Sequence, residues 1–412
     1  MGKSIAIVLG GTIPHIELIK NLRNRGYYTI LVDYLDRPPA KFFADEHIQE
    51  STMEVEGVHR IAKERIAKLV ISTSIDQANL VACKVGEILG LPIPYSYVTA
   101  LKVTNKTLMK EIMNKLDIPT SRFNVFRNFE DINEQTLKFP LVVKPSDATG
   151  SKGVRKCRDF TEFKKFFPGA FDISRNGEVI VEEYLNGTEV QLDFFVVNGN
   201  PKLLMTRKKV NINLDNKAVL QSFGSIVPAQ LSSKALGKIQ QVADKLAVDL
   251  SLQNTPLFIQ AKIDQDNVNI IEFALRIGGG LSYSMIKIIT GFDITNAAID
   301  TFLNNKIDVV INETKDIFIT YLIYVQPCIF GNIKGLKELK EAGKIEEYYV
   351  FKTKGMKISP QMTSSDRVAA LLVKGADTET LYKQITLIIS EVRVYDINGN
   401  PIMQKDVIFL NN

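Results

Sequence analysis

Residues 270–280 have the sequence IIEFALRIGGG, an apolar run of strand type that ends in three consecutive glycines. Glu272 and Arg276 lie on either side of the point where this strand should break. A carboxylate suits Mg²⁺, an arginine suits phosphate oxygens, and glycines let a ligand approach the backbone closely. The segment therefore favours a site for phosphoryl transfer, and a structural ion pair between Glu272 and Arg276 is the alternative.

A second segment, FPLVVKP at 139–145, presents Lys144 at the end of an apolar strand. The following loop, DATGSKG at 147–153, consists mainly of small residues, and its glycines would let backbone N–H groups reach phosphate oxygens. The pattern differs from the GxxxxGK[ST] loop of P-loop proteins. Alone, it fits either a phosphate clamp or a surface hairpin.

A third segment, VIVEEYLNGTEV at 179–190, ends a predicted strand with Glu182 and Glu183 and places Glu189 after an Asn-Gly turn. Carboxylates can accept hydrogen bonds from an adenine amino group or from ribose hydroxyls. Taken alone, the segment is more typical of a solvated strand end.

The whole chain has an ordinary composition for a soluble protein. Its 412 residues are enough for two or three domains, with 45% apolar residues, 24% charged residues and a formal net charge of +5. No long basic run favours a nucleic-acid groove. Cys83, Cys157 and Cys328 are far apart and form no CxxC pair, which argues against a disulfide framework or a zinc site. Without a membrane-length apolar stretch or a signal-peptide pattern, we expect a cytoplasmic protein with no nucleic-acid or membrane partner.

Predicted strands and helices alternate over residues 1–97, which indicates a parallel, doubly wound sheet. Ligands bind such sheets at the carboxyl ends of the strands, where this chain has Gly10, Gly11 and Asp33. These residues also fit the start of a nicotinamide or sugar-nucleotide enzyme. However, the third glycine of the GxGxxG pattern is missing, because Pro14 and His15 occupy that stretch.

The order of these features is more informative than any one of them. A lysine-bearing helix at 105–116 precedes the strand-end lysine with its glycine loop, the EEYL strand and the ExxxRxGGG strand end. In this order the chain resembles the ATP-grasp superfamily, in particular the carboxylate–amine ligases near biotin carboxylase, carbamoyl-phosphate synthase and the L-amino-acid ligases. The resemblance covers roughly residues 1–305 and extends less specifically to the last hundred residues.

The resemblance implies an α/β and α+β multidomain fold. Residues 1–97 would form a Rossmann-like pre-ATP-grasp domain with a doubly wound parallel sheet. Residues 98–305 would form the ATP-grasp domain, with a mobile lid at about 120–186. Residues 306–412 would form a C-terminal mixed α/β domain.

The resemblance also implies that the chain binds ATP together with Mg²⁺, or with Mn²⁺ in its place. Lys106 and Lys144 would hold the phosphates beneath the loop 149–153. Arg276 would stabilise the transferring phosphoryl group, so Arg276 and Lys144 are the candidate catalytic residues.

The adenosine end of ATP would be bound by the EEYL strand and the turn after it. Glu182 would face the adenine amino group, Glu183 and Leu185 would contribute backbone hydrogen bonds, and Glu189 would bind the ribose. The full ATP-binding set is Lys106, Lys144, Thr149, Gly150, Ser151, Lys152, Gly153, Glu182, Glu183, Leu185 and Glu189. Leu257 and Phe258 are apolar candidates for packing near the adenine or in the core, and Lys208 is read as a solvated lysine in a basic run.

The candidate metal ligands are Glu272 and Gln260. Relatives usually carry an acid at the position of Gln260, and an asparagine at the position of Ala274. An amide oxygen can still bind a metal but brings no charge, so the substitution implies weaker metal binding.

The resemblance implies an ATP-dependent, amide-forming ligase. It would join a small carboxylate, such as an amino acid, to an amine through an acyl phosphate, converting ATP to ADP and phosphate. We expect small-molecule partners and a homodimer. Candidate substrate contacts, besides the glycines at 278–280, are Gly11, Thr12, His15, Asp76, Gln77, Ser364, Ser365 and Arg367. The alternatives are a non-catalytic or regulatory ATP-binding protein of the same fold, motivated by Gln260, and the nicotinamide or sugar-nucleotide enzyme.

Overall fold

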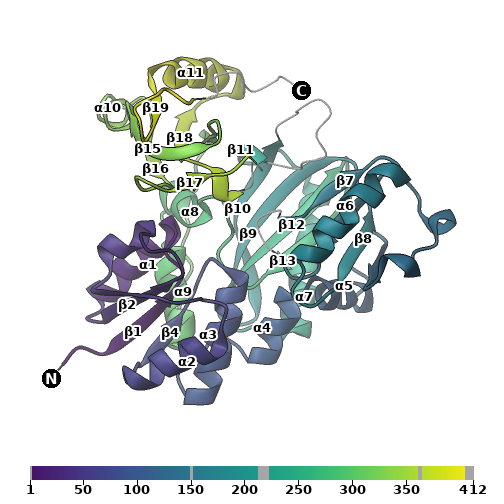
Figure 1. Ribbon diagram of the computed structural model, residues 1–412, viewed down its shortest axis with the longest axis horizontal. Coiled ribbons are helices and arrows are strands. Elements are labelled where there is room, and N and C mark those ends of the chain that lie inside the picture. The colour runs from purple at the N-terminus through teal and green to yellow at the C-terminus, as the bar shows by residue number, and fades with distance from the viewer. Residues whose placement is uncertain (1, 149–151, 212–221, 361–363, 404–412) are drawn as a thin grey trace.

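The computed structural model describes residues 2–148, 152–211, 222–360 and 364–403, and Figure 1 shows how they are arranged. Within these residues the strands form four sheets. No helix in the described ranges combines the length and the apolarity that crossing a bilayer requires.

The N-terminal unit is a four-stranded parallel sheet of order β3-β2-β1-β4, with helices packed on it. Residues 6–9 of β1 are all fully buried, which means that both faces of the sheet are covered. The parallel sheet confirms the expectation for residues 1–97. The elements are β1 (Ile5–Leu9), α1 (Ile13–Asn24), β2 (Tyr28–Asp33), η1 (Pro39–Phe43), β3 (Glu46–Gln49), α2 (Val55–Glu64), β4 (Leu69–Ile71) and α3 (Asp76–Leu89).

One covering helix of this sheet comes from far along the chain. Ile299 and Phe302 of α9 (Ile294–Phe302) belong to the same apolar core as β1 and β2. Arg25, which follows α1, donates two hydrogen bonds to Asp300 on α9, at 2.6 and 2.9 Å. The N-terminal sheet is therefore completed by a helix that lies within the predicted central domain.

A separate four-stranded antiparallel sheet, of order β5-β8-β6-β7, forms within residues 123–183. Helix α6 packs on this sheet through Phe163 and Phe167. The unit coincides with the segment for which a lid is predicted, and its closure over a ligand stays a prediction. Its elements, with the two helices before it, are α4 (Tyr97–Thr104), α5 (Lys106–Lys115), β5 (Phe123–Phe126), η2 (Phe129–Asp131), η3 (Glu134–Thr136), β6 (Leu141–Pro145), β7 (Arg155–Cys157), α6 (Phe160–Ile173) and β8 (Val179–Glu183).

The largest element is an eight-stranded antiparallel sheet of order β13-β12-β9-β10-β11-β14-β18-β16. It runs through the boundary predicted at 305/306, because β11 pairs with β14 from Gly224↔Tyr321 to Val227↔Phe318. Its elements, with the helices beside them, are β9 (Thr188–Val197), β10 (Asn200–Asn211), β11 (Ser222–Val227), α7 (Ser233–Asp249), β12 (Thr255–Asp264), β13 (Asn267–Ala274), α8 (Ser282–Thr290), β14 (Ile317–Ile323), β16 (Glu347–Val350) and β18 (Ala369–Gly375).

The fourth sheet is small and lies in the C-terminal part of the chain. It has three strands, in the order β17-β15-β19. The elements are β15 (Cys328–Lys334), α10 (Leu336–Glu341), β17 (Lys357–Ile358), η4 (Ser364–Asp366), α11 (Thr378–Glu391) and β19 (Arg393–Asp396).

Candidate functional site

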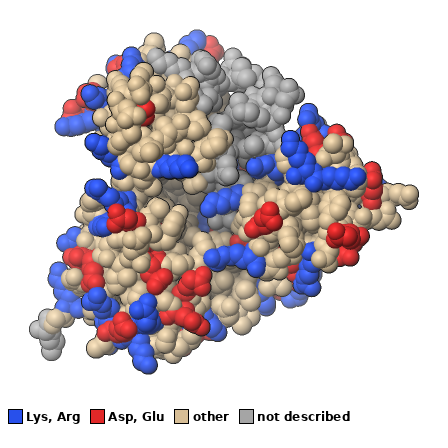
Figure 2. Space-filling model, in the orientation of Figure 1, with Lys and Arg blue, Asp and Glu red and all other residues tan. Residues whose placement is uncertain are grey.

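A cavity of about 450 Å³ lies where the three large units meet. Figure 2 shows this face of the molecule hollowed between the units, with Lys and Arg side chains along the hollow. Its lining comes from the start of α3, from β6 and β8, and from six neighbouring strands of the large sheet, β13 to β14. The predicted site residues that line it are Lys106, Lys144, Glu182, Glu183, Leu185, Glu189, Gln260, Glu272 and Arg276, together with Asp76, Phe258, Gly279, Gly280 and Arg367.

The floor of the cavity is a row of polar side chains across the large sheet. Glu272 pairs in register with Gln260, Gln260 with Gln191, and Gln191 with Arg207. Because side chains alternate between the two faces of a strand, residues 207 and 209 of β10 face the cavity and Lys208 does not. This alternation within the basic run 207–209 was the signal that could have revealed Arg207 and Lys209, which the sequence interpretation did not select.

Lys144 and Glu182 form a buried ion pair at one wall of the cavity, with Nζ 2.5 Å from Oε1. The second carboxylate oxygen of Glu182 accepts from Ser121 at 2.7 Å and lies 2.9 Å from Nζ of Lys110. Burial alone would raise the pKa of Glu182, but Lys144 and Lys110 lower it to about 2. Both oxygens of Glu182 thus have partners within the protein, and Oε1, which accepts from Lys144, retains a lone pair for a further donor.

Lys106 begins helix α5, which Asn105 caps by accepting from the backbone N–H of Leu108. Its ammonium group donates to the carbonyl of Ala148 at 2.5 Å. Burial lowers the pKa of Lys106, and the charge of Glu272 is the largest influence that opposes this shift. In the described part of the chain, no carboxylate lies within 4 Å of this ammonium.

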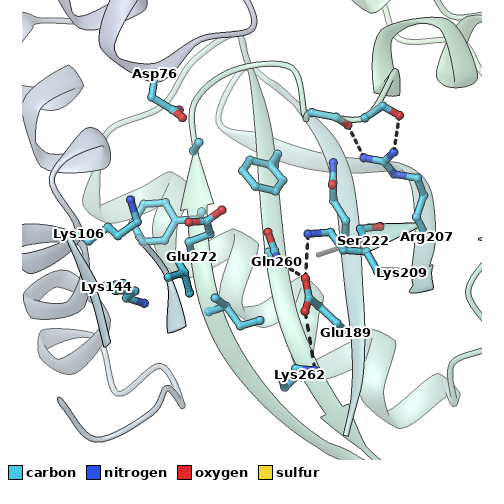
Figure 3. A pocket seen from close by; sticks show the side chains of 18 of the residues that line it. Asp76, Lys106, Lys144, Glu189, Arg207, Lys209, Ser222, Gln260, Lys262 and Glu272 are labelled. Atoms are coloured by element: carbon cyan, nitrogen blue, oxygen red, sulfur yellow. Dashed lines mark hydrogen bonds and ion pairs between the residues drawn. The ribbon is translucent and has the colours of Figure 1, made fainter. Parts of the chain in front are cut away.

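Glu189 is held by three side chains from two neighbouring strands (Figure 3). Lys209 lies 2.8 Å and Lys262 3.7 Å from its carboxylate, and the amide nitrogen of Gln260 donates to it. Burial alone would raise the pKa of Glu189, but Lys209 and Lys262 lower it. The ribose contact predicted for Glu189 stays a prediction. A ribose hydroxyl at this position would donate to a carboxylate whose orientation Lys209, Lys262 and Gln260 already set.

Arg276 is oriented by Asp76, at the start of α3. Its Nε and Nη2 donate to the two oxygens of Asp76 at 2.7 and 2.8 Å, and its guanidinium lies 4.9 Å from the centre of the Phe258 ring. The next residue, Ile277, donates its backbone N–H to the carbonyl of Thr73 at 3.0 Å. The N-terminal sheet and the glycine loop are therefore tied together at the cavity.

Arg207 supports the glycine loop from below. It donates to the carbonyls of Gly280 at 2.9 Å and Gly279 at 2.7 Å, and to Oγ of Ser282 at 2.8 Å. Its charge is balanced by the buried Asp193, whose carboxylate lies 3.7 Å from Nε. Arg207 therefore fixes the path of the loop that follows Arg276.

Several predicted residues lie away from the cavity lining. Lys152 and Gly153 are described but do not line it, and Thr149, Gly150 and Ser151 lie outside the described residues. In the N-terminal unit, Gly11, Thr12, His15 and Gln77 are absent from the lining. The same is true of Ser365, and the side chain of Ser364 is not among those described.

The absence of Gly11, Thr12 and His15 from the lining has a structural explanation. His15 is fully buried, its Nδ1 is 2.9 Å from Oγ1 of Thr12, and burial lowers its pKa to about 4. Gly11 donates its N–H to Asp33 at 2.6 Å. The strand ends that suggested a dinucleotide site are thus filled by the protein's own side chains.

The donor set fits a nucleotide with one bound metal ion. Five acids line the cavity, and Glu272 is the one that has no lysine or arginine within 4 Å in the described ranges. No group of three or more His, Cys, Asp or Glu suited to a metal occurs among the described residues. Magnesium is commonly held by one or two carboxylates together with substrate phosphates, which Glu272 and the carbonyl of Gln260 can match.

Comparison with known proteins agrees with this geometry. Residues 137–284 match the family model described as "ATP-grasp domain". The chain is 28% identical over 267 residues to a phosphoribosylamine–glycine ligase of Caldanaerobacter subterraneus, covering 58% of this chain and 61% of the relative. It spans less than two thirds of the length of the curated relatives considered, which also include a carbamoyl phosphate synthase large chain and a D-alanine–D-alanine ligase.

Solved structures show the same fold over nearly the whole chain. An L-amino acid ligase from Bacillus licheniformis superposes with a TM-score of 0.76 at 21% identity, covering 96% of this chain and 99% of that one. The biotin carboxylase domain of a Hydrogenobacter thermophilus 2-oxoglutarate carboxylase, a dimer in complex with MgADP, ADP and bicarbonate, gives 0.73 at 16% identity, covering 98% and 92%. These likenesses confirm the predicted α/β multidomain fold.

Proposed function

We propose that this chain, which carries an ATP-grasp domain at residues 137–284, is an ATP-dependent carboxylate–amine ligase acting on small molecules. One observation carries the proposal. Lys106 and Glu272, which have no oppositely charged side chain within 4 Å among the described residues, line the same cavity as Lys144 and Arg276. Together these groups suit a triphosphate and its metal ion, and the ligases among the relatives support the reaction class.

A carboxylate is a poor electrophile, and transfer of the γ-phosphoryl group of ATP onto it creates a phosphate leaving group that an amine can displace. The protein's part in the transfer is positioning and charge neutralisation. Lys106 and Lys144 would face the phosphate oxygens, and Arg276, held by Asp76, would face the transferring group. Magnesium, when bound at Glu272, would neutralise further phosphate charge.

Water must be kept from the activated carboxylate, since it would hydrolyse it. The sheet β5-β8-β6-β7 contributes Val142, Lys144 and Glu182 to the cavity wall. We propose that this unit closes over the nucleotide and excludes water.

The test is a coupled assay of ADP release with pooled amino acids, small carboxylates and amines. We expect ADP release that depends on both substrate and magnesium. Arg276→Ala should reduce turnover by about 10³-fold or more while ATP affinity changes little. Unchanged turnover in Arg276→Ala would remove this residue from the reaction.

A regulatory ATP-binding protein of the same fold is the second candidate, and Gln260 is the observation that favours it. Its amide nitrogen donates to Glu189, so only a neutral carbonyl oxygen is left for a metal. Gln260→Glu should tighten Mn²⁺ binding, measured by titration with ATP present. ATP binding without ADP release in the wild type, with every substrate pool, would favour the regulatory function. A homodimer and a cytoplasmic location stay predictions.

A further inference from the structure

We infer that the amine substrate carries a carboxylate of its own, which Arg367 binds at the end of the cavity opposite Lys106. The inference rests on the proposed ligase function and names the class of its second substrate, an amino acid or a peptide with a free carboxylate.

The cavity is longer than the phosphate-binding residues require. Beyond Lys209 its floor continues over Ser225 of β11 and Thr320 of β14, which lie in register across the sheet. Neighbouring strands are about 4.8 Å apart, so the six strands from β13 to β14 span roughly 24 Å. In Figure 3, Lys106 and Lys144 lie on one side of this floor, and Arg207 and Ser222 lie on the other.

Two of the cations that line the cavity differ from the others in having no carboxylate partner among the described residues. The lysines and arginines of the lining are Lys106, Lys144, Arg207, Lys209, Lys262, Arg276 and Arg367. All except Lys106 and Arg367 have a carboxylate within 4 Å among the described residues. Lys106 lies at the phosphate end. Arg367 is therefore the lining cation, among the described residues, that could bind a second anion.

Arg367 is held in a geometry suited to a carboxylate. Its Nε donates to the hydroxyl of Tyr324 at 2.9 Å, and that hydroxyl donates to the carbonyl of Ser222 at 3.2 Å. Within the described ranges, neither Nη group of this half-buried guanidinium has a hydrogen-bond partner, and such a fork matches the two oxygens of a carboxylate. Ser225, which also lines this end, can add a hydroxyl donor, whereas the hydroxyl of Ser222 donates to the carbonyl of Gly224 at 2.9 Å.

The position of Arg367 assigns this anion to the amine substrate. The carboxylate that is activated must lie beside the transferring phosphoryl group, near Arg276 and Glu272. Arg207 is not available to bind this second carboxylate, because both of its Nη groups donate to the glycine loop and to Ser282. A molecule whose amine reaches the activated carboxylate would extend away from it along β10 and β11, with its own carboxylate at Arg367.

The experiment offers the full chain Mg-ATP, the twenty amino acids and their α-amides together, and identifies the products by mass spectrometry. Apart from the α-amides of aspartate and glutamate, which keep a side-chain carboxylate, an α-amide can react only as an amine, so it tests the second site separately from the first. We expect products that end in a free carboxylate. Products that end in a carboxamide at similar rates would overturn the inference while leaving the ligase function intact.

Variants connect this selectivity to Arg367. Arg367→Gln should raise the KM for the amine by about 10- to 100-fold without changing the KM for ATP, and Arg367→Lys should fall between it and the wild type. Arg393→Gln, an exposed arginine on β19, is the matched control and should behave as the wild type. An unchanged KM for the amine in Arg367→Gln would contradict the assignment.

A binding measurement keeps the inference testable apart from turnover. With Mg-AMPPNP bound, amino acids should raise the melting temperature of the wild type, and their α-amides should not. Arg367→Lys, which retains the charge and the fold, should show a smaller rise. If no amino acid raises the melting temperature, or if the amides raise it equally, the inference fails. ADP release with another carboxylate and amine would then show that the ligase proposal still stands.

Discussion

Asp76 and Arg276 are 200 residues apart in the chain, yet they form the bidentate pair that orients the guanidinium beside the cavity. Asp76→Asn removes the negative charge and one of the two acceptors. Because a hydrogen bond between charged groups contributes about 1.5–3 kcal/mol, we expect ADP release to fall about 10- to 100-fold with little change in ATP affinity. Asp36→Asn, at an exposed acid paired with Lys41, is the control. Wild-type turnover in Asp76→Asn would show that Arg276 does not depend on this pair.

Glu182 neutralises two buried lysines, and Glu182→Gln would leave Lys110 and Lys144 without a counter-charge. Breaking a buried ion pair typically costs about 3–5 kcal/mol, which urea unfolding at pH 7 would measure. Glu183→Gln, at the neighbouring, partly exposed acid paired with Arg122, should cost less than about 1 kcal/mol. Equal costs for the two variants would contradict this account of the cluster.

The same residue makes stability depend on pH in a defined direction. The pKa of Glu182 is lowered from 4.5 to about 2 in the folded state. Its contribution is therefore complete above pH 4.5 and is lost as the pH falls toward 2, because the unfolded chain binds the proton first. In Glu182→Gln this part of the acid destabilisation should be absent.

At the scale of elements, the glycine loop after β13 depends on a close approach at Gly278. A Cβ at this position would overlap the side chains of Gln191 and Asp193 and lie 2.7 Å from Oγ of Ser282. We expect Gly278→Ala to lower the free energy of unfolding by about 1–3 kcal/mol, as overpacking does. A Cβ at Gly279 meets no atom within 4 Å, so Gly279→Ala should leave the melting temperature nearly unchanged. Equal melting temperatures for the two variants would show that the loop yields without cost.

The elements themselves were largely predictable from local pattern. Apolar positions with helical spacing predict a helix over Asp76–Leu89, and helix α3 has these bounds. The sequence also predicts a helical stretch over His15–Arg25, but helix α1 begins at Ile13, since Pro14 is tolerated in a first turn whose N–H groups have no helical partner. What the pattern could not reveal is pairing between distant segments, such as β11 with β14 or α9 with the N-terminal sheet.

For the site, too, local pattern predicted the residues but not the tertiary contacts between them. The order of motifs predicted Lys106, Lys144, Glu189 and Glu272, and the structure brings all four to one cavity. Their partners could not be predicted, because an ion pair such as Arg276 with Asp76 depends on tertiary contacts. Gln260, predicted as a metal ligand, has its amide committed to Glu189, which no spacing rule anticipates.

At the scale of the whole molecule, the predicted boundary at 305/306 can be tested by truncation. A chain of residues 1–305 would leave β11 as an open edge and would lose Ile319 and Leu371 from the core. We expect it to aggregate or to lack a cooperative melting transition, as seen by size-exclusion chromatography and calorimetry. Co-expression of residues 306–412 should restore part of the soluble protein. A well-folded, monomeric 1–305 fragment would show instead that the boundary is a true domain border.

The continuous sheet from β13 to β14 has a consequence for selectivity. Strands joined by hydrogen bonds cannot slide apart to suit a longer guest, so the gap between the reacting centre and Arg367 is set by how many strands separate them. Homologous amines that differ by one methylene between nitrogen and carboxylate should then react at different rates, because only one length brings the nitrogen to the reacting centre while the carboxylate contacts Arg367.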